Sequence, residues 1–466
     1  MEPIVFKTDN NNCYLYSPAK KELLPIPENV YGEIVSSQQF SSSLWQSFRT
    51  NGYLTPYKEE FDGIVDKNTI RSSLKNLSQI VFETTTNCNL RCEYCCYGEG
   101  YSTFDSRREK SGHLTFEIGK AILDYMATIF GCEQLSNSPL EPFAVSFYGG
   151  EPLMNFSVIK QIVEYAETLN FRNRKLCFTM TTNAMLLAKY ADFLHKHKFK
   201  LLVSLDGDKP RNKYRKTARG GNSFDLVMSN LKKVKCSYPE WFGTFNFNVV
   251  YTNVSDVKHI VSWFRENLGK TPQFSPLHPP TLGSKDFDKI HSMLSKFDVP
   301  EEFSNDKDLI VQHPLYKRIL EFSHSLFGNV KHKETDIVAN DIHRYASGTC
   351  IPFSKRIFVS YNGELHPCEK IYRDFPLGEI TKEGKVLIDC NHIAKNFMEK
   401  VIGVKKVCQE CYLQLCCTKC IFSFDKGQCD SFTTKQRFSE LLSHTVSYIE
   451  SHPNIVSILD EKIITK

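Results

Sequence analysis

The chain has 466 residues, of which 41% are hydrophobic and 24% charged, which indicates a folded globular protein long enough for several domains. Its 58 basic and 53 acidic residues leave a net charge of +5, too nearly balanced to indicate a nucleic-acid-binding protein. No apolar run is long enough to span a membrane, and the first residues, MEPIVFKTDNNN, lack the apolar core of a signal peptide. We therefore expect a cytoplasmic protein whose 17 cysteines are metal ligands or core residues rather than disulfides.

Residues 1–78 are predicted to form a small α+β module. PIVFKT, CYLYSP and ELLPI are short strand candidates joined by polar turns, and ENVYGEIVSS follows as a helix. A module of this kind either decorates the main domain or offers an edge strand to an extended peptide. The pattern alone leaves both interpretations open.

Apolar strands and amphipathic helices alternate through residues 79–280. The strand candidates are 79–85, 143–149, 175–181, 200–206, 245–251 and 271–277. Between the first two, TFEIGKAILDYMATIF carries apolar residues at intervals of three and four, the spacing of a helix stripe. Strand–helix alternation predicts a parallel sheet, closed into a full or partial barrel.

The short polar motifs of this segment each come directly after a predicted strand. Cys88, Cys92 and Cys95 follow the first strand in the spacing C-x3-C-x2-C, GGEP (149–152) follows the second, and TTNAM and SLDGD follow the third and fourth. In a parallel barrel the loops after the strands meet on one face and build the active site. We therefore expect these motifs to converge.

Three thiolates on one tight loop indicate a metal site with an open position. A structural zinc site needs a fourth protein ligand, and the adjacent Cys96 points away from Cys95 in an ordinary backbone. Three thiolates with one free corner suit an iron–sulfur cluster that binds substrate through its fourth iron. The spacing favours the cluster and leaves zinc open.

C-x3-C-x2-C after a first strand, Tyr94 before the last cysteine and GGEP after the second strand together resemble the radical S-adenosylmethionine (SAM) enzymes. The resemblance covers about 200 residues and implies a partial (β/α)6 TIM-like barrel, an α/β fold. It implies that Cys88, Cys92 and Cys95 bind three irons of a 4Fe-4S cluster whose fourth iron chelates SAM. One electron then splits SAM into methionine and a 5′-deoxyadenosyl radical, which removes a hydrogen atom from a C–H bond.

The remaining motif residues fit a SAM pocket. The candidate cofactor-binding residues are Tyr94, Gly149, Gly150, Glu151, Pro152, Asn183, Ser204, Asp206 and Asn253. The two glycines allow backbone to approach a ligand closely. Glu151 is expected to accept from the SAM ammonium, and Ser204 and Asp206 lie where ribose hydroxyls need acceptors. Taken singly, each motif is also compatible with an ordinary turn.

After a charged bridging segment, 281–345, which we expect to be helical, the cysteines return in 346–466. They are Cys350, Cys368, Cys408, Cys411, Cys416, Cys417, Cys420 and Cys429. KRIFVSYNGELHP reads as short strands and KQRFSELLSHTVSYIESHP as a final helix. A zinc ribbon that uses Cys408, Cys411, Cys417 and Cys420 is one interpretation of this region.

The same pattern resembles the SPASM extension of radical SAM peptide maturases, which carries two auxiliary 4Fe-4S clusters. The resemblance implies an outer cluster held by Cys408, Cys411, either Cys416 or Cys417, and Cys429. It implies an inner cluster held by Cys350, Cys368 and Cys420. Fully ligated members have a further cysteine where this chain has Arg356 and its neighbours, so we expect an open iron, filled by a substrate thiolate or by His366.

Two further features of the sequence bear on the reaction. Glu369 directly follows Cys368, and its position resembles that of a carboxylate that acts as a base in some sulfatase-maturing relatives. The alternative interpretation is that Glu369 is an exposed surface glutamate. Residues 204–224 resemble those maturases too, but Arg211-Asn212 stands where many have a His-Asp pair.

These features together predict a radical SAM/SPASM enzyme that crosslinks a ribosomally made precursor peptide (a RiPP), most simply through a cysteine thioether. Residues 1–78 then resemble a winged-helix-like module (RRE-like) that binds the leader of the precursor peptide as an added strand, and the electron donor is a reduced flavodoxin or ferredoxin. Formylglycine formation, carbon–carbon crosslinking and epimerisation remain alternatives. A non-catalytic, metal-stabilised peptide carrier is the alternative from another class of protein.

Overall fold

The computed structural model describes residues 1–36, 43–58, 60–95, 97, 111–131, 142–172, 174–277, 285–295, 351–369, 375–415, 417, 419–424, 429 and 431–453, with the single residues 306, 309, 312 and 346. The chain divides into two compact units. One is continuous from 66 to 298 and adds 351–394. The other combines 1–65, 299–350 and 395–466. Most of the predicted bridging segment 281–345 lies outside the described residues.

The first of these units is built on a parallel sheet in chain order. Its six strands are β4 (Gln79–Thr85), β5 (Phe143–Gly149), β6 (Leu176–Thr182), β7 (Lys200–Ser204), β8 (Asn246–Tyr251) and β9 (Gln273–Pro276), each hydrogen-bonded to the next. All six predicted strands are confirmed. Strand β7 ends two residues early, because Asp206 leads into a turn at Gly207 with a φ of 120°.

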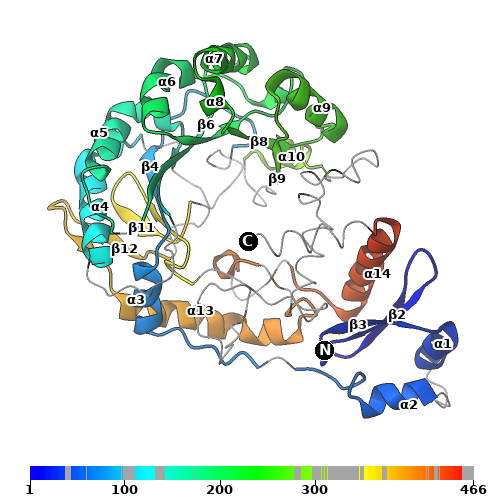
Figure 1. Ribbon diagram of the computed structural model, residues 1–466. Helices are drawn as coiled ribbons and strands as arrows, with labels where there is room; N and C mark the ends of the chain where they lie inside the picture. Colours follow the sequence, from blue (N-terminus) through cyan, green and yellow to red (C-terminus); the bar gives the residue numbers. More distant parts are fainter. Residues whose placement is uncertain are drawn as a thin grey trace. The chain divides into compact units, whose positions relative to one another are not determined.

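Helices cover the convex side of this sheet, as Figure 1 shows. They are α4 (Phe116–Gly131), α5 (Phe156–Ala166), α6 (Leu187–Lys196), α7 (Phe224–Ser237), the short α8 (Pro239–Phe242) and α9 (Val257–Leu268). In α4, Ile122, Leu123 and Met126 are fully buried, as the predicted stripe requires. Sequential parallel strands with outer helices make a partial (β/α)6 barrel, so the predicted fold class is confirmed.

Four further strands extend the same sheet beyond β4. Strand β10 (Arg356–Val359) pairs parallel with β4, and β11 (Glu364–His366), β12 (Gly378–Ile380) and β13 (Val386–Leu387) continue antiparallel. The short elements α3 (Lys67–Lys75), η2 (Pro152–Asn155), η3 (Arg211–Tyr214) and α10 (Phe287–His291) complete the described part of this unit. The start of the predicted C-terminal region is thus continuous with the barrel sheet.

The second unit is centred on a small antiparallel sheet of β1 (Ile4–Lys7), β2 (Cys13–Ser17) and β3 (Glu22–Ile26). Helices α1 (Glu28–Ser36) and α2 (Ser43–Thr50) pack on one face through Val30 and Phe48. The C-terminal helix α14 (Lys435–Ser451) packs on the other face, with Phe438, Leu442 and Val446 against Ile4, Phe6 and Tyr16.

The remaining elements carry the C-terminal cysteines. Helix α13 (Cys390–Glu410) leads into a turn that ends at the short helix η5 (Ile421–Ser423). Among the described residues, no helix combines the length and the apolar composition that a membrane crossing requires.

Candidate active site

The three-cysteine loop follows β4 and is held by the chain after β7. The backbone N–H of Arg91 donates to the Lys216 carbonyl (2.7 Å), and that of Glu93 donates to the Tyr214 carbonyl (3.0 Å). Leu90 and Thr217 form an isolated antiparallel bridge. The backbone of the cysteine loop is therefore held by hydrogen bonds to the chain after β7.

The thiols of Cys88, Cys92 and Cys95 are close enough to influence one another. Burial is the main reason that the pKa of Cys88 is raised to about 11 and that of Cys92 to about 12, and the neighbouring thiols act in the same direction. No group of three or more ligand side chains in the described parts of the chain is tight enough to hold one metal ion. An iron–sulfur cluster binds each thiolate through a different iron, so three cysteines on one loop suit such a cluster without the fourth protein ligand that a structural zinc ion needs.

The two glycines of GGEP are required by the backbone of the cysteine loop itself. A Cβ on Gly150 would lie 2.1 Å from the Asn87 carbonyl oxygen, and one on Gly149 would lie 2.4 Å from that of Thr85. Gly149 also has a φ of 129°. The N–H of Gly150 donates to Thr85 (2.7 Å) and that of Glu151 to Asn87 (2.8 Å). The motif thus fixes the residues that directly precede Cys88.

Glu151 presents a buried carboxylate beside this loop, only 1% exposed. It accepts from the Thr182 hydroxyl (2.7 Å), from the N–H of Asn183 (2.8 Å) and from that of Leu153 (3.2 Å). Burial raises the pKa of Glu151 to about 7, although these hydrogen bonds oppose the shift. A carboxylate with three donors has capacity for one more, which is what contact with a SAM amino group requires.

Asn183 connects this carboxylate to the cysteines. Its amide nitrogen donates to the Asn89 side chain (2.8 Å) and lies 3.6 Å from the Cys88 sulfur. Pro152 begins the turn η2 and is buried. The motifs after β4, β5 and β6 therefore meet at one edge of the sheet, as predicted from their positions after strands.

Asp206 and Tyr94 belong to a buried network that includes Arg215. Asp206 Oδ1 accepts from Arg215 Nη2 and from the N–H of Val250, both at 3.0 Å, and Oδ2 accepts from the Tyr94 hydroxyl. Burial alone would lower the pKa of Arg215, but the Asp206 carboxylate raises it above its usual value. Burial also raises the pKa of Tyr94 well above its usual range. The network therefore holds in place the side chain of Tyr94, which lies between Cys92 and Cys95 in the sequence.

Ser204 and Asn253 lie at the same ends of the strands. Ser204 is the last residue of β7, and Asn253 follows β8, where its side chain donates to the Ser292 carbonyl (2.8 Å) and accepts from Tyr214 (2.9 Å). The ribose contacts predicted for Ser204 and Asp206 stay predictions. Sequence reasoning missed Arg215, because one arginine within KYRKTARGG carries no signal that distinguishes it from its basic neighbours.

Glu369 and Arg356 form a second polar site beyond β4. Arg356 Nη1 lies 3.1 Å from both oxygens of Glu369, whose side chain is 14% exposed. Cys368 directly precedes this glutamate and is half-buried. His366 is buried, 3.4 Å from Glu364 and against the Phe358 ring. Arg356, one of the residues among which the resemblance implies a missing cysteine ligand, is thus ion-paired to the candidate base.

The cysteine-rich turn after α13 gathers part of the predicted outer set. Cys408 and Cys411 are buried, and the N–H of Thr433 donates to the Cys411 sulfur (3.4 Å). Burial raises the pKa of Cys411, and Cys417 and Cys429 raise it further, so these thiols share one locality. Cys420 follows on the same turn and is half-buried. Cys350 and Cys416 lie outside the described residues.

Residues 82–264 match the sequence model of the Radical SAM superfamily. This range starts in β4 and ends in α9, so it contains the cysteine loop, the GGEP turn and the Asp206 network. The chain is therefore a radical SAM enzyme, which uses a 4Fe-4S cluster and SAM.

More particularly, the chain is related to the anaerobic sulfatase-maturating enzymes. The cysteine-type enzyme of Clostridium novyi (strain NT) is 25% identical over 365 residues, 74% of this chain and 88% of that one. The serine-type enzyme of Bacteroides thetaiotaomicron is 23% identical over 372 residues, 76% of this chain and 81% of that one.

Solved structures share the fold. "Native anSMEcpe with bound AdoMet" has a TM-score of 0.54 and 21% identity, covering 82% of this chain and 99% of that one. "Native anSMEcpe with bound AdoMet and Kp18Cys peptide" has a TM-score of 0.52 and 19% identity, with the same coverage.

The metal-free protein is expected to become less stable as the pH rises, because the folded state holds a proton on Glu151 that it then loses. Its folded-state pKa of about 7 lies above the usual 4.5, so the folded state holds the extra proton between these values. Stability therefore falls from about pH 4.5 to about pH 7, by about 2–4 kcal/mol, and is constant above. Urea unfolding of Glu151→Gln should lack this fall, whereas Glu164→Gln, on the exposed side of α5, should keep it. Parallel profiles for all three proteins would contradict the assignment.

Proposed function

We propose that this radical SAM enzyme modifies a ribosomally made precursor peptide and forms a thioether between a cysteine sulfur and a carbon of that peptide. The observation that carries this proposal is the ion pair of Arg356 with Glu369. The resemblance implies one more cysteine shortly after Cys350, where Arg356 and its neighbours offer none, so the implied inner ligand set of Cys350, Cys368 and Cys420 is one sulfur short. A substrate cysteine completes the set.

The proposed cofactors are three 4Fe-4S clusters and SAM: one SAM-binding cluster on the first cysteine loop and two auxiliary clusters on the C-terminal cysteines. When bound, the first cluster and SAM supply a 5′-deoxyadenosyl radical that takes a hydrogen atom from a substrate C–H bond. Glu369 would take the thiol proton as the substrate sulfur binds the open iron, and an auxiliary cluster would take the one electron that is released when the C–S bond closes.

The chain's own residues position the reacting groups and do not themselves transfer electrons. Arg356 Nη1 donates to both oxygens of Glu369, which restrains the carboxylate beside Cys368. Asn183 orients Glu151 and lies against Cys88, so the SAM pocket and the cysteine loop are held together. The peptide's leader binds the module of residues 1–78, and a reduced flavodoxin or ferredoxin supplies electrons.

Formylglycine formation is the second candidate, favoured by the sulfatase-maturating enzymes that match about three quarters of the chain. Against it, the chain has Arg211-Asn212 at the position of a frequent His-Asp pair. Asn212 is fully buried, accepts from the N–H of Asp206 (3.2 Å) and donates to Asn222 (3.1 Å). Its side chain is therefore already engaged in hydrogen bonds that stabilise the turn after β7.

Mass spectrometry of a co-expressed precursor peptide tests the proposal. A thioether removes two hydrogens, keeps the sulfur and leaves no thiol for alkylation. Formylglycine made from cysteine replaces sulfur by oxygen and also loses two hydrogens. A carbon–carbon crosslink loses two hydrogens but leaves the thiol reactive, and epimerisation leaves the mass unchanged. Any outcome except the first contradicts the thioether proposal.

Replacing Glu369 with glutamine is expected to slow crosslink formation about 10²–10⁴-fold, the usual contribution of a general base. Release of 5′-deoxyadenosine should persist, because hydrogen abstraction from the C–H bond does not involve Glu369. Both products are measured by chromatography and mass spectrometry in one reaction. Glu379→Gln, an exposed glutamate on β12 of the same sheet, is the control. Equal crosslinking rates for the two variants would exclude Glu369 as the base.

A further inference from the structure

Gln414 carries a buried side-chain amide within the cysteine-rich turn after α13. The residue is 9% exposed, and neither its Oε1 nor its Nε2 has a hydrogen-bond partner among the residues that the structure describes. The buried amide of Asn230 shows the usual arrangement, because it donates to the carbonyls of Ala184 and Met185, both at 2.9 Å. An amide without a partner is costly to bury, so the Gln414 side chain is placed for a group that the described residues do not supply.

The backbone brings Gln414 beside one of the predicted cluster ligands. Its N–H donates to the Cys411 carbonyl (3.2 Å), which closes a four-residue turn and brings the two residues close together. The two central residues of this turn, Tyr412 and Leu413, pack against the core between the N-terminal sheet and α14. The apolar side of the turn is therefore occupied by its central residues, and its polar end residues, Cys411 and Gln414, are neighbours.

The sulfur of this neighbouring cysteine already accepts hydrogen bonds. The backbone N–H groups of Leu413 and Thr433 both hydrogen-bond to the Cys411 sulfur, the latter at 3.4 Å. In the first cysteine loop the N–H of Leu90 donates to the Cys88 sulfur, also at 3.4 Å and also from two positions further along the chain. Hydrogen bonds to the sulfurs are one of the factors that set the reduction potential of an iron–sulfur cluster. The donors around Cys411 are therefore of the kind that a cluster ligand accepts.

We propose that the side-chain amide of Gln414 donates a hydrogen bond to a sulfur of the outer auxiliary cluster and raises the reduction potential of that cluster. The physical reason is charge: the reduced cluster is one unit more negative, so a donor at its sulfur stabilises the reduced state more than the oxidised state. The effect is strengthened by burial, because water neither competes for the sulfur nor screens its charge.

The inference rests on the proposed function, which supplies both the outer cluster and the electron that an auxiliary cluster takes. When the C–S bond closes, one electron leaves the substrate and one cluster is reduced by one electron. A higher potential makes the outer cluster a better acceptor for that electron. Gln414 therefore adjusts the acceptor and takes no part in hydrogen abstraction or proton transfer.

Redox titration of the reconstituted full chain tests the hydrogen bond. The electron paramagnetic resonance signals of the reduced clusters are followed against potential in the parent and in Gln414→Leu, which fills a similar volume without a donor. The substitution should change the one-electron equilibrium of one auxiliary cluster about tenfold, lowering its potential by about 59 mV. The signal that shifts should persist in Cys368→Ala, which lacks an inner-cluster ligand, and the signal that responds to SAM should not shift.

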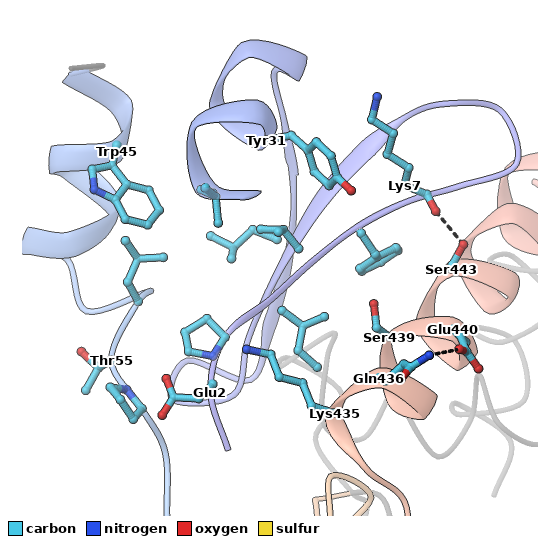
Figure 2. A pocket seen from close by; sticks show the side chains of 18 of the residues that line it. Glu2, Lys7, Tyr31, Trp45, Thr55, Lys435, Gln436, Ser439, Glu440 and Ser443 are labelled. Atoms are coloured by element: carbon cyan, nitrogen blue, oxygen red, sulfur yellow. Dashed lines mark hydrogen bonds between the residues drawn. The ribbon is translucent and has the colours of Figure 1, made fainter. Parts of the chain in front are cut away.

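Gln436→Leu is the matched control, because it makes the same change at an exposed glutamine of the same unit. Gln436 lies in the first turn of α14, lines the groove beside β1 and donates to Glu440 (3.2 Å), as Figure 2 shows. The potentials of this variant should equal those of the parent. Gln414→Met, which has an unbranched side chain and no donor, should reproduce the shift of Gln414→Leu, and circular dichroism reports whether each variant folds.

Urea unfolding separates a role at the cluster from a role in packing. In the metal-free protein Gln414→Leu should raise the urea midpoint, because it removes a buried amide that has no described partner. In the cluster-loaded protein this gain should disappear, because the amide then has its acceptor. A lower midpoint for metal-free Gln414→Leu would show that the amide is paired within the polypeptide, and would overturn the inference.

The outcomes distinguish this inference from the proposed function. Clusters that assemble and a thioether that forms, with potentials in both Gln414 variants equal to those of the parent, would overturn the inference alone. A shifted potential with no thioether in the co-expressed precursor would contradict the proposed function and support the inference. A reconstituted protein without an iron–sulfur cluster on its C-terminal cysteines would overturn both.

Discussion

Replacing Cys95 with alanine is expected to remove the SAM-binding cluster from the anaerobically reconstituted protein. The loop backbone is held independently by Lys216 and Tyr214, so the variant should fold but present only two thiolates to a cluster that needs three. Bound iron and acid-labile sulfide should each fall by about four per chain. The change in the electron paramagnetic resonance spectrum on SAM addition should disappear as well.

Cys177→Ala is the matched control, because Cys177 is a half-buried cysteine on β6 of the same barrel and belongs to neither cysteine group. Its iron content and its response to SAM should equal those of the parent. A Cys95→Ala protein that keeps the full iron content would contradict the assignment of the loop. Zinc in place of iron in the parent would instead favour the metal-stabilised carrier.

Replacing Arg215 with methionine is expected to lower the free energy of unfolding of the metal-free protein by about 3–5 kcal/mol. Arg215 and Asp206 have side chains only 8% and 3% exposed, 3.0 Å apart. Removing the guanidinium leaves a buried carboxylate without its counter-charge, and the hydrogen bonds from Tyr94 and Val250 do not replace it. Urea unfolding followed by circular dichroism measures the loss.

Two comparisons isolate the buried pair from a general effect of substitution. Lys209→Met breaks an exposed ion pair with Asp225 and should cost less than about 1 kcal/mol. Combining Arg215→Met with Asp206→Asn should recover part of the loss, because the unpaired charge is then gone. A loss for Arg215→Met as small as that for Lys209→Met would show that the pair does not stabilise the barrel.

Local patterns were sufficient to predict the parallel sheet and the convergence of its motifs. Strands β4 and β5 are runs of apolar and β-branched residues with polar motifs at one end only, and the parallel arrangement brings those ends to one edge. The apolar stripe of α4 likewise predicts the face that it buries. In each case the determining residues are neighbours in the sequence.

Long-range partners could not be predicted in the same way. Helix α14 packs on a sheet more than 400 positions earlier in the chain. An apolar stripe that includes Phe438 and Leu442 shows that the helix buries one face, but it does not identify the element against which that face packs. The pairing of Arg215 with Asp206 depends on how the chain returns after β7. Gly149 and Gly150 were expected to make room for a ligand, whereas the nearest atoms belong to the cysteine loop.

The most direct test of the account is release of 5′-deoxyadenosine. The protein is purified without oxygen, reconstituted with iron and sulfide, and given SAM and dithionite. The account predicts 5′-deoxyadenosine and methionine from the parent and from Cys177→Ala, and neither from Cys95→Ala. Failure of the iron-loaded parent to cleave SAM, or equal release by Cys95→Ala, would contradict the central claim that Cys88, Cys92 and Cys95 hold the cluster at which SAM is cleaved.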